Sequence, residues 1–443
     1  MSDALVIGAG LAGLVAARDL TEAGLSVTVV ESSAYVGGHA RTTEQDGFAW
    51  EWGPHTLTST AHATHALVDA LGIRSELVRV GQPSTRYIFR DGQMRALPNK
   101  LTGVFRSRAL SRRGWLRALA EPLIRSSAPH GETVADFFAR RLGVEAMEML
   151  VSSFVSGIHA GDVRQLGIED AFPKVARWER EHGSVVRGAL ASRRASGTEP
   201  SHGITAFRRG TGALSEALAS SLRQPVQLNT PVQALSRAES GFVATAGSAK
   251  LYAQHVVVAT PPPVTWSLLG EWMNLPALGP MAPIAVVHLM GTDGEPPTGF
   301  GVLVPPSQRG SGRAVRALGV LFVSSQVPAR APGDGWLLTV FLGGTTDSSA
   351  LELSDEALVG VAVRDVASIT GFTPVTRHTA VFRQVSAIPQ MTPGHLQRVQ
   401  AFKRSVSSIP GLAVAGNWLG GVSVEHAVQS GHDAASQLLA QEV

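Results

Sequence analysis

The chain has 443 residues, more than one hydrophobic core usually serves, so two or three lobes are expected. It is 44% hydrophobic and 16% charged, with a formal net charge of +3, which excludes a disordered or strongly acidic protein. The absence of cysteine excludes disulfides, thiolate metal sites, a cysteine nucleophile and a cysteinyl cofactor link. The longest apolar candidate, residues 273–290, contains three prolines, and no signal segment opens the chain. These features predict a globular protein of the cytoplasm.

The first elements form a strand, a glycine-rich turn and a helix. Residues 5–7 predict a buried parallel strand, and a helix follows the turn to about residue 23. A second strand, residues 27–30, ends in Glu31, where an acid accepts hydrogen bonds from an adenosine ribose. This order favours a dinucleotide-binding loop over a turn that serves packing alone, but it does not distinguish FAD from NAD. The glutamate disfavours NADP, whose 2′-phosphate it would repel. The glycines of this G-x-G-x-x-G turn are Gly8, Gly10 and Gly13.

A helix-rich stretch is predicted from about residue 99 to 195, and its first part is strongly basic. Residues 100–125 hold seven basic residues against one acid, Glu121. Nucleic acid is a poor match, because no recognised binding motif accompanies the charge. The basic face suits an anionic membrane surface, an acidic substrate or plain solvation. Its basic residues are Lys100, Arg106, Arg108, Arg112, Arg113, Arg117 and Arg125.

The second half of the chain mixes strands and helices. Residues 204–223 predict a glycine turn that leads into a helix, while 225–235 and 241–246 alternate like antiparallel strands. Residues 255–263 predict a buried strand that prolines stop, and 261–391 reads as mixed strands and helices with many turns. No metal site is predicted, because the closest histidines, His62 and His65, lack a matching third ligand.

The C-terminus repeats the arrangement of the N-terminus. Residues 414–435 predict a short apolar strand, a turn at Gly416, Gly420 and Gly421, and a helix. A turn without Cβ atoms lets a ligand approach closely, and a helix start presents free N–H groups. The alternative is an ordinary strand and helix that bind nothing.

The segment after Glu31 carries Gly37, Gly38 and Arg41 in a G-G-x-x-R-[ST] pattern, which resembles the FAD-dependent amine oxidase superfamily. The resemblance implies non-covalent FAD, with the N-terminal turn at the diphosphate, Val232 near the adenine and the C-terminal turn at the isoalloxazine. There a helix start would face the pyrimidine edge, where negative charge grows on reduction. The implied cofactor-binding residues are Gly8, Gly10, Gly13, Glu31, Gly38, Arg41, Val232, Gly416, Val422 and Val424.

Four further stretches, 141–188, 299–305, 341–344 and 388–395, together resemble the protoporphyrinogen and coproporphyrinogen oxidases of haem synthesis. The resemblance implies that six electrons are removed from a porphyrinogen and that oxygen regenerates the flavin. Because the flavin would carry this chemistry, no catalytic side chain is nominated. The chain departs from the family after Pro54, and Ser423 stands where glycine is common.

The resemblance also implies an α/β fold with three parts. A discontinuous Rossmann-like FAD-binding domain would comprise 1–82, 196–260 and 392–443. A mixed α+β substrate-binding domain would comprise 83–98 and 261–391. Residues 99–195 would form a helical domain that can associate with a membrane, where Phe105, Trp115, Leu116 and Leu119 could anchor an interfacial helix.

Two residues are implied at the substrate. Arg86 would bind a propionate. The alternative is that Arg86 is a solvent-exposed arginine with no role in binding. Gly157 would lie on the cavity floor and leave room for a flat macrocycle, with a simple turn glycine as the alternative. The resemblance would place the strand predicted at 284–289 near the substrate macrocycle, but its apolar sequence favours a place in the hydrophobic core.

Other functions remain open in the sequence. An amine or polyamine oxidase would share the FAD elements but leaves the 141–188 and 388–395 similarities unexplained. A flavoprotein that binds a tetrapyrrole without oxidising it also fits, whereas a carotenoid desaturase has no use for Arg86. The sequence does not separate protoporphyrinogen from coproporphyrinogen, and it is silent on the oligomeric state.

Overall fold

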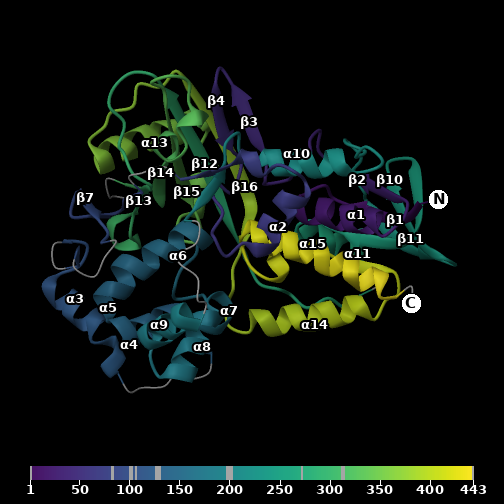
Figure 1. The fold of residues 1–443 in the computed structure, drawn as a ribbon, viewed down its shortest axis with the longest axis horizontal. Coiled ribbons are helices and arrows are strands. Elements are labelled where there is room, and N and C mark those ends of the chain that lie inside the picture. The colour runs from purple at the N-terminus through teal and green to yellow at the C-terminus, as the bar shows by residue number, and fades with distance from the viewer. Residues whose placement is uncertain are drawn as a thin grey trace.

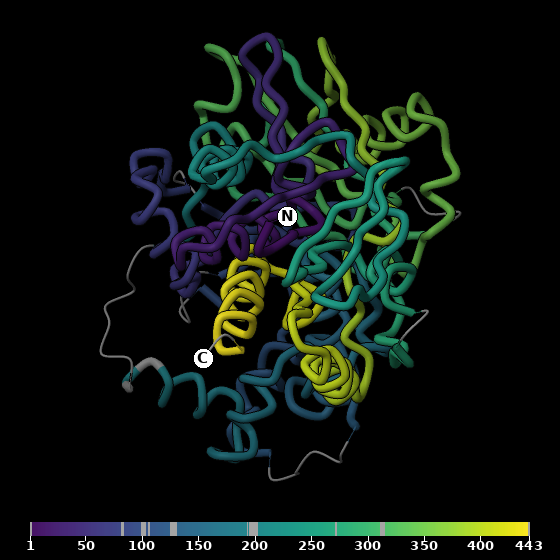
Figure 2. Tube along the Cα trace, turned by 90° about the vertical axis from the view of Figure 1, so that its right-hand side faces the viewer, coloured from purple at the N-terminus to yellow at the C-terminus, as the bar shows by residue number. Residues whose placement is uncertain are grey.

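The computed structural model describes residues 2–80, 84–98, 103–104, 107–124, 131–195, 203–270, 273–310 and 315–441. Two large sheets organise this part of the chain, and a group of helices lies beside the second sheet (Figure 1). The first and last elements of the chain lie together at one end of the molecule, as Figures 1 and 2 both show.

The six-stranded sheet has the order β2-β1-β11-β10-β9, with β17 paired to β11. Strands β1, β2, β11 and β17 are parallel, and β9 and β10 continue the sheet in antiparallel fashion. Its parallel strands are apolar because helices such as α1 and α15 cover them. The strands are β1 (Ser2–Ile7), β2 (Val27–Val30), β9 (Ala234–Ala238), β10 (Gly241–Ala246), β11 (Ala249–Val258) and β17 (Leu412–Val414).

The seven-stranded sheet has the order β16-β12-β15-β14-β13-β6-β7, in which only β13 and β6 pair in parallel. Two strands that come early in the chain therefore complete a sheet built mainly from residues after 280. The strands are β6 (Arg86–Arg90), β7 (Gln93–Ala96), β12 (Met281–Gly291), β13 (Gly301–Leu303), β14 (Gly319–Phe322), β15 (Trp336–Gly343) and β16 (His378–Pro389). Two short antiparallel pairs join β3 (Thr42–Gln45) to β4 (Phe48–Glu51) and β5 (Leu77–Arg79) to β8 (Thr205–Phe207).

The helices fall into three groups. Those of the six-stranded sheet and its surroundings are α1 (Leu11–Glu22), α2 (His62–Ala70), α10 (Gly212–Ser221), α11 (Pro262–Leu269), α14 (His395–Ser407) and α15 (Val424–Leu439). Those of the seven-stranded sheet are α12 (Val323–Gln326) and α13 (Asp355–Thr370). The third group is α3 (Arg112–Leu119), α4 (Val134–Leu142), α5 (Val144–Ala146), α6 (Ser152–His159), α7 (Ile168–Ala171), α8 (Pro173–His182) and α9 (Val185–Ala195).

Most elements lie where the sequence patterns predict them. The second strand matches 27–30, and the helix after the first glycine turn ends at Glu22. One expectation is wrong: residues 225–233 are not a full strand, and β9 begins only at Ala234. Instead, Gln227 forms a single parallel bridge to Val30, because the prolines at 225 and 231 interrupt the ladder on either side.

The strand predicted at 284–289 is the centre of β12, and alternate side chains point to opposite faces of the sheet. Ala285, Val287 and Leu289 enter the core beneath α13. Ile284 lies on the other face and packs with Phe341. The strand therefore contributes both to a core and to the face that lies away from α13.

Candidate functional site

The turn after β1 divides its three glycines between two tasks. A Cβ on Gly8 would lie 2.5 Å from the Ala259 carbonyl oxygen, and one on Gly13 would lie 2.0 Å from the Gly8 carbonyl oxygen. Both residues are therefore needed for close packing of strand and helix. A Cβ on Gly10 would meet no atom within 4 Å, although Gly10 caps the N-terminus of α1 and no side chain caps that end. The open space beside a free helix start suits a phosphate.

Glu31 follows β2 and connects the neighbouring turns. Its Oε2 accepts a 2.8 Å hydrogen bond from the Ala9 N–H, while Oε1 accepts one from the Ser33 N–H at 2.9 Å. The carboxylate thus lies at the edge of the glycine turn. Because Oε1 also accepts the hydroxyls of Ser32 and Ser33, Oε2 is the oxygen that can accept a further hydroxyl. This is the position that the sequence predicts for a ribose-binding acid.

The second glycine segment lies against the first. Gly37 donates its N–H to the Ala9 carbonyl oxygen at 2.7 Å and forms a parallel bridge with Gly10. Gly38 has φ +57°, and a Cβ there would lie 3.4 Å from the Gly10 Cα. The two glycine segments therefore form one continuous backbone surface.

Arg41 lies against two aromatic rings. Its guanidinium carbon lies 3.5 Å from the ring centroid of Tyr35 and 4.0 Å from that of Trp52. Among the ion pairs of the described residues, none includes Arg41. A cation held by aromatic rings has N–H groups to offer an anion, which fits the cofactor-binding role that the resemblance implies for Arg41.

Val232 reaches the same edge through the segment before it. The Thr230 N–H donates to the Glu31 carbonyl oxygen at 2.8 Å, and the Gln227 N–H donates to the Val29 carbonyl oxygen at 2.9 Å. Val232 is partly buried against a core cluster. The segment therefore runs along the end of β2, as expected for a residue near an adenine.

The C-terminal turn leaves the same edge of the sheet. Register places Ile7, Val30, Val258 and Val414 side by side, so the residues that follow them emerge together. In open α/β sheets this carboxyl edge is where ligands bind. The strand order therefore explains why glycine turns at opposite ends of the chain serve one site.

Within the C-terminal turn, the predicted residues have different surroundings. A Cβ on Gly416 would lie 2.3 Å from Trp418 Nε1, so this glycine is needed for packing. Val422 is half-buried in the turn, and Val424 is buried at the first position of α15. Ser423 caps α15, because its hydroxyl accepts the His426 N–H, which accounts for a hydroxyl residue at a position where glycine is common in the family.

Glu425 was missed by sequence reasoning. It lies in the first turn of α15, and its carboxylate accepts the Ala63 and Thr64 N–H groups, each at 2.8 Å. It thereby caps α2, and the hydrogen bonds from Thr64 and Ala63 lower its pKa despite the opposing effect of burial. A glutamate just inside a helix N-terminus is the only signal in the sequence, and that signal does not reveal the partner.

The two predicted substrate residues lie on one face of the seven-stranded sheet. Arg86 pairs with Gly301 and Ile88 pairs with Leu303, so their side chains share the face of Leu303. A Cβ on Gly157 would lie 2.6 Å from Leu303 Cδ2. Helix α6 therefore lies against the face that carries Arg86, and the Arg86 guanidinium itself is exposed over the Phe300 ring.

An apolar stripe marks the exposed side of α6. Phe154 is 48% exposed and Ile158 40%, and with Gly157 they follow the i, i+3, i+4 spacing of one helix face. Immediately before α6, Met147–Val151 form a π-helical turn, an irregularity that often occurs at functional sites. The stripe is an exposed apolar surface on the same helix that packs on Leu303 through Gly157.

A buried group of rings that sequence reasoning did not identify lies where β4 meets the seven-stranded sheet. His55 contacts Phe341 edge-on at 5.9 Å between centroids and lies 6.5 Å from the His288 ring. Burial, with Arg330 and His288 adding to it, holds the pKa of His55 well below its ordinary value. Burial likewise lowers the pKa of His288 to about 3. Both rings are therefore neutral near pH 7, and His55 Nε2 is buried without a hydrogen-bond partner among the described residues.

Comparison with known proteins agrees with this geometry. The family model described as flavin containing amine oxidoreductase matches residues 11–439. Protoporphyrinogen oxidase of Homo sapiens is 31% identical over 99% of this chain and 98% of its own length. Mitochondrial protoporphyrinogen oxidase of Nicotiana tabacum is 29% identical over 98% of this chain and 94% of its own length. Coproporphyrinogen III oxidase of Bacillus subtilis is 27% identical over 98% of this chain and 97% of its own length.

Solved structures share the fold. A protein from Exiguobacterium sp. 255-15, provisionally assigned as a protoporphyrinogen oxidase, superposes with a TM-score of 0.86 at 24% identity, covering 98% of each chain. Putrescine oxidase bound to putrescine superposes with a TM-score of 0.71 at 19% identity, covering 99% of each chain. The chain belongs to the flavin containing amine oxidoreductase family, and its cofactor is FAD. The predicted fold class and cofactor are thereby confirmed.

Proposed function

We propose that this protein oxidises a porphyrinogen, protoporphyrinogen IX or coproporphyrinogen III, to the porphyrin in haem biosynthesis, with oxygen as the electron acceptor. The observation that carries the proposal is similarity over the whole chain to porphyrinogen oxidases, including 31% identity to the human enzyme. The exposed apolar stripe of α6, on a helix that packs on the sheet carrying Arg86, supports a flat substrate with carboxylates. FAD, when bound, supplies an acceptor for hydrogen from a substrate carbon.

The proposed cofactor contacts are the glycine turns and the carboxyl edge of the six-stranded sheet. Gly10 and Gly38 leave the backbone open, Glu31 accepts ribose hydroxyls, and Arg41 faces the diphosphate. Val232 lies by the adenine, and the turn from Gly416 through Val422 to Val424 lies by the flavin ring. On this assignment, 1–82, 196–260 and 392–443 form the cofactor domain.

The proposed substrate contacts come from the seven-stranded sheet and the helices. Arg86 holds a propionate, because a guanidinium matches a carboxylate in two hydrogen bonds. Gly157 and its apolar neighbours on α6 contact the flat face of the macrocycle and exclude water. Residues 83–98 and 261–391 then form the substrate domain, and 99–195 the helical domain.

The reaction is tested by porphyrin fluorescence. Purified protein with bound flavin is mixed in air with protoporphyrinogen or coproporphyrinogen, and spontaneous oxidation is subtracted. Growth of fluorescence above that background is expected with at least one substrate. Peroxide release with amines but not with porphyrinogens would contradict the proposal and favour an amine oxidase. Porphyrin binding without turnover would favour a carrier.

We further propose that the helical domain binds an anionic bilayer on its cytoplasmic face. Three leucines of α3 and the short helix after it are 43–76% exposed and recur along one side, beside exposed Arg112 and Arg113. Trp115 is half-buried and so is a weaker anchor than predicted, and Phe105 lies outside the described residues. Arg117 is engaged internally, donating to the carbonyl oxygens of Arg140 and Arg141. The leucines are Leu116, Leu119 and Leu123.

No described helix is both long and apolar enough to cross a membrane. The test is co-sedimentation with vesicles of phosphatidylserine and phosphatidylcholine against vesicles of phosphatidylcholine alone. Substitution of Leu116, Leu119 and Leu123 by serine is expected to abolish binding to the anionic vesicles. Val375→Ser, which changes an equally exposed valine elsewhere, is the matched control and should bind normally. Equal binding by both variants would contradict the proposal.

A further inference from the structure

A second arginine lies beside α6, and unlike Arg86 it is buried. Arg309 follows the short helix Pro306–Gln308 and is 8% exposed. Its Nη2 donates to the Ser156 hydroxyl at 2.7 Å, while its Nε is buried and has no hydrogen-bond partner among the described residues. The guanidinium is therefore held by one neutral group and is only partly satisfied.

The nearest acid does not neutralise Arg309. Asp347 is the acid that acts on the Arg309 charge, but its two carboxylate oxygens accept hydrogen bonds from Arg316 at 2.9 Å and 2.7 Å. Burial lowers the pKa of Arg309 to about 10, so the side chain stays protonated near pH 7. A buried cation without a counter-ion is costly, and buried charges in proteins are normally paired. The environment of Arg309 thus lacks an anion.

The position of Arg309 relates it to the proposed substrate site. Ser156, its hydrogen-bond partner, precedes Gly157 on α6, and Gly157 packs on Leu303 at the end of β13. Arg86 pairs with the first residue of β13. Where α6 packs on β13, Arg86 therefore lies beside the first residue of β13, and Arg309 lies beyond the last residue of β13.

We infer that Arg309 binds a propionate that coproporphyrinogen III has and protoporphyrinogen IX lacks, and that this contact makes the protein select coproporphyrinogen III. The inference rests on the proposed function. Coproporphyrinogen carries two propionates where protoporphyrinogen carries vinyl groups. A propionate at Arg309 would use its free N–H groups in charge-assisted hydrogen bonds. A vinyl group there would leave the buried cation unpaired, and sites built for a polar group discriminate strongly against analogues that lack it.

The test compares Arg309→Gln, Arg309→Lys and the wild type on both substrates. In Arg309→Gln, kcat/KM for coproporphyrinogen is expected to fall about 10- to 100-fold, because hydrogen bonds to a charged group are lost. For protoporphyrinogen it should change less than about threefold. Arg309→Lys should recover part of the loss because it keeps the charge. Arg237→Gln, an exposed arginine on β9, is the matched control.

A second readout does not depend on turnover. Binding of coproporphyrin III and protoporphyrin IX, followed by quenching of tryptophan fluorescence, should show the same loss for coproporphyrin alone. Equal losses of affinity for both porphyrins, or no loss, would overturn the inference. It would also be overturned if an inorganic anion raised the melting temperature of the wild type while Arg309→Gln still preferred coproporphyrinogen as substrate. Failure of the wild type to oxidise either porphyrinogen would instead refute the proposed function. Thermal melting and flavin content confirm that each variant is folded.

Discussion

Gly10 and Gly13 lie three residues apart in one turn, yet they should respond to the same substitution in different ways. Gly10→Ala places a methyl group in open space with an ordinary φ of −69°, so the apoprotein should fold normally. Its FAD affinity should fall about tenfold or more, equivalent to about 1.4 kcal/mol, because the methyl group displaces a phosphate. Gly13→Ala would press on the Gly8 carbonyl and should cost at least about 2 kcal/mol of folding free energy. Flavin titration and urea unfolding separate the two outcomes.

Gly157 permits a similar separation of packing from substrate contact. Gly157→Ala should destabilise the protein by about 1–3 kcal/mol, because its Cβ would overlap Leu303. The double variant with Leu303→Ala should regain the lost stability. Its kcat/KM should remain low, since the added methyl group still occupies space that the macrocycle would use beside α6. Recovery of full activity in the double variant would mean that Gly157 serves packing alone.

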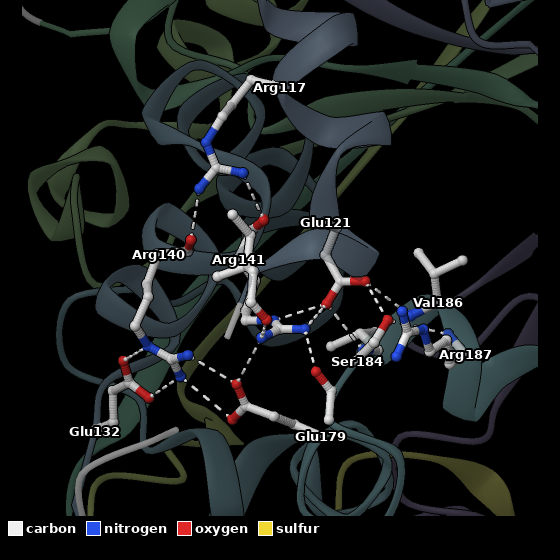
Figure 3. Close-up of polar contacts among 12 residues, drawn as sticks. Arg117, Glu121, Glu132, Arg140, Arg141, Glu179, Ser184, Val186 and Arg187 are labelled. Carbon is white, nitrogen blue, oxygen red and sulfur yellow. Dashed lines mark hydrogen bonds and ion pairs between the residues drawn. The ribbon is translucent and has the colours of Figure 1, made fainter. Parts of the chain in front are cut away.

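Helices α4, α8 and α9 are joined by a buried charge network, which Figure 3 shows around Arg141. Arg141 and Glu121 are both 0% exposed and form an ion pair, and the Glu121 carboxylate also accepts from the Ser184 hydroxyl and the Val185 N–H. Arg140 bridges Glu132 and Glu179 at 2.8 Å and 2.7 Å. The single acid of the basic stretch is thus an internal anchor and does not offset charge at the surface.

Arg141→Met should therefore be strongly destabilising. It leaves Glu121 buried without its cation, a change that typically costs about 3–5 kcal/mol. Arg180→Ala breaks an exposed pair with Glu169 and should cost no more than about 1 kcal/mol. Urea unfolding followed by circular dichroism measures both. A cost for Arg141→Met as small as that for Arg180→Ala would show that the network adds little.

A histidine joins α15 to α1 and makes their contact depend on pH. His432 Nδ1 lies 2.5 Å from Asp19 Oδ2, and this hydrogen bond raises the pKa of His432, with Asp433 adding to the shift and Arg18 opposing it. Because the folded protein binds this proton more tightly than the unfolded chain, the stabilisation is fully present below about pH 6.5. It should be lost as pH rises through the raised pKa. In His432→Gln, the melting temperature should no longer fall as pH rises through the raised pKa of His432. If the dependence of the melting temperature on pH is unchanged in this variant, other groups cause it.

Across the whole molecule, the cofactor site draws on the beginning, middle and end of the chain. Figure 2 shows α15 next to the N-terminal elements, and α1 and α15 are in contact. Removal of FAD should therefore loosen both glycine turns together. Hydrogen exchange should rise at 8–13 and 416–424 but not in α13, and FAD at 100 times its Kd should add about 2.7 kcal/mol of stability. Faster exchange at only one turn would contradict a shared site.

Local patterns were enough to predict the glycine turns, strands β1 and β2, and helices α1 and α15, whereas the FAD cofactor and the family were predicted from the resemblance to known sequences. These features depend on spacing within short segments, where the backbone needs of a turn and the periodicity of strand and helix leave a clear trace. The strand predicted at 225–235 was wrong up to residue 233, because its alternation of apolar and polar residues was read without the effect of the prolines at 225 and 231, which interrupt pairing.

Only the tertiary structure paired residues that lie far apart in the chain. Glu425 caps α2 more than three hundred residues away, Gly157 meets Leu303, and Arg309 lies against Ser156 without an acid to balance it. Such partners are chosen by long-range packing, because a side chain's burial and neighbours depend on which elements the fold brings together. In the sequence Arg309 is one arginine among many, and only its burial with an unpartnered Nε singles it out as a candidate binding residue.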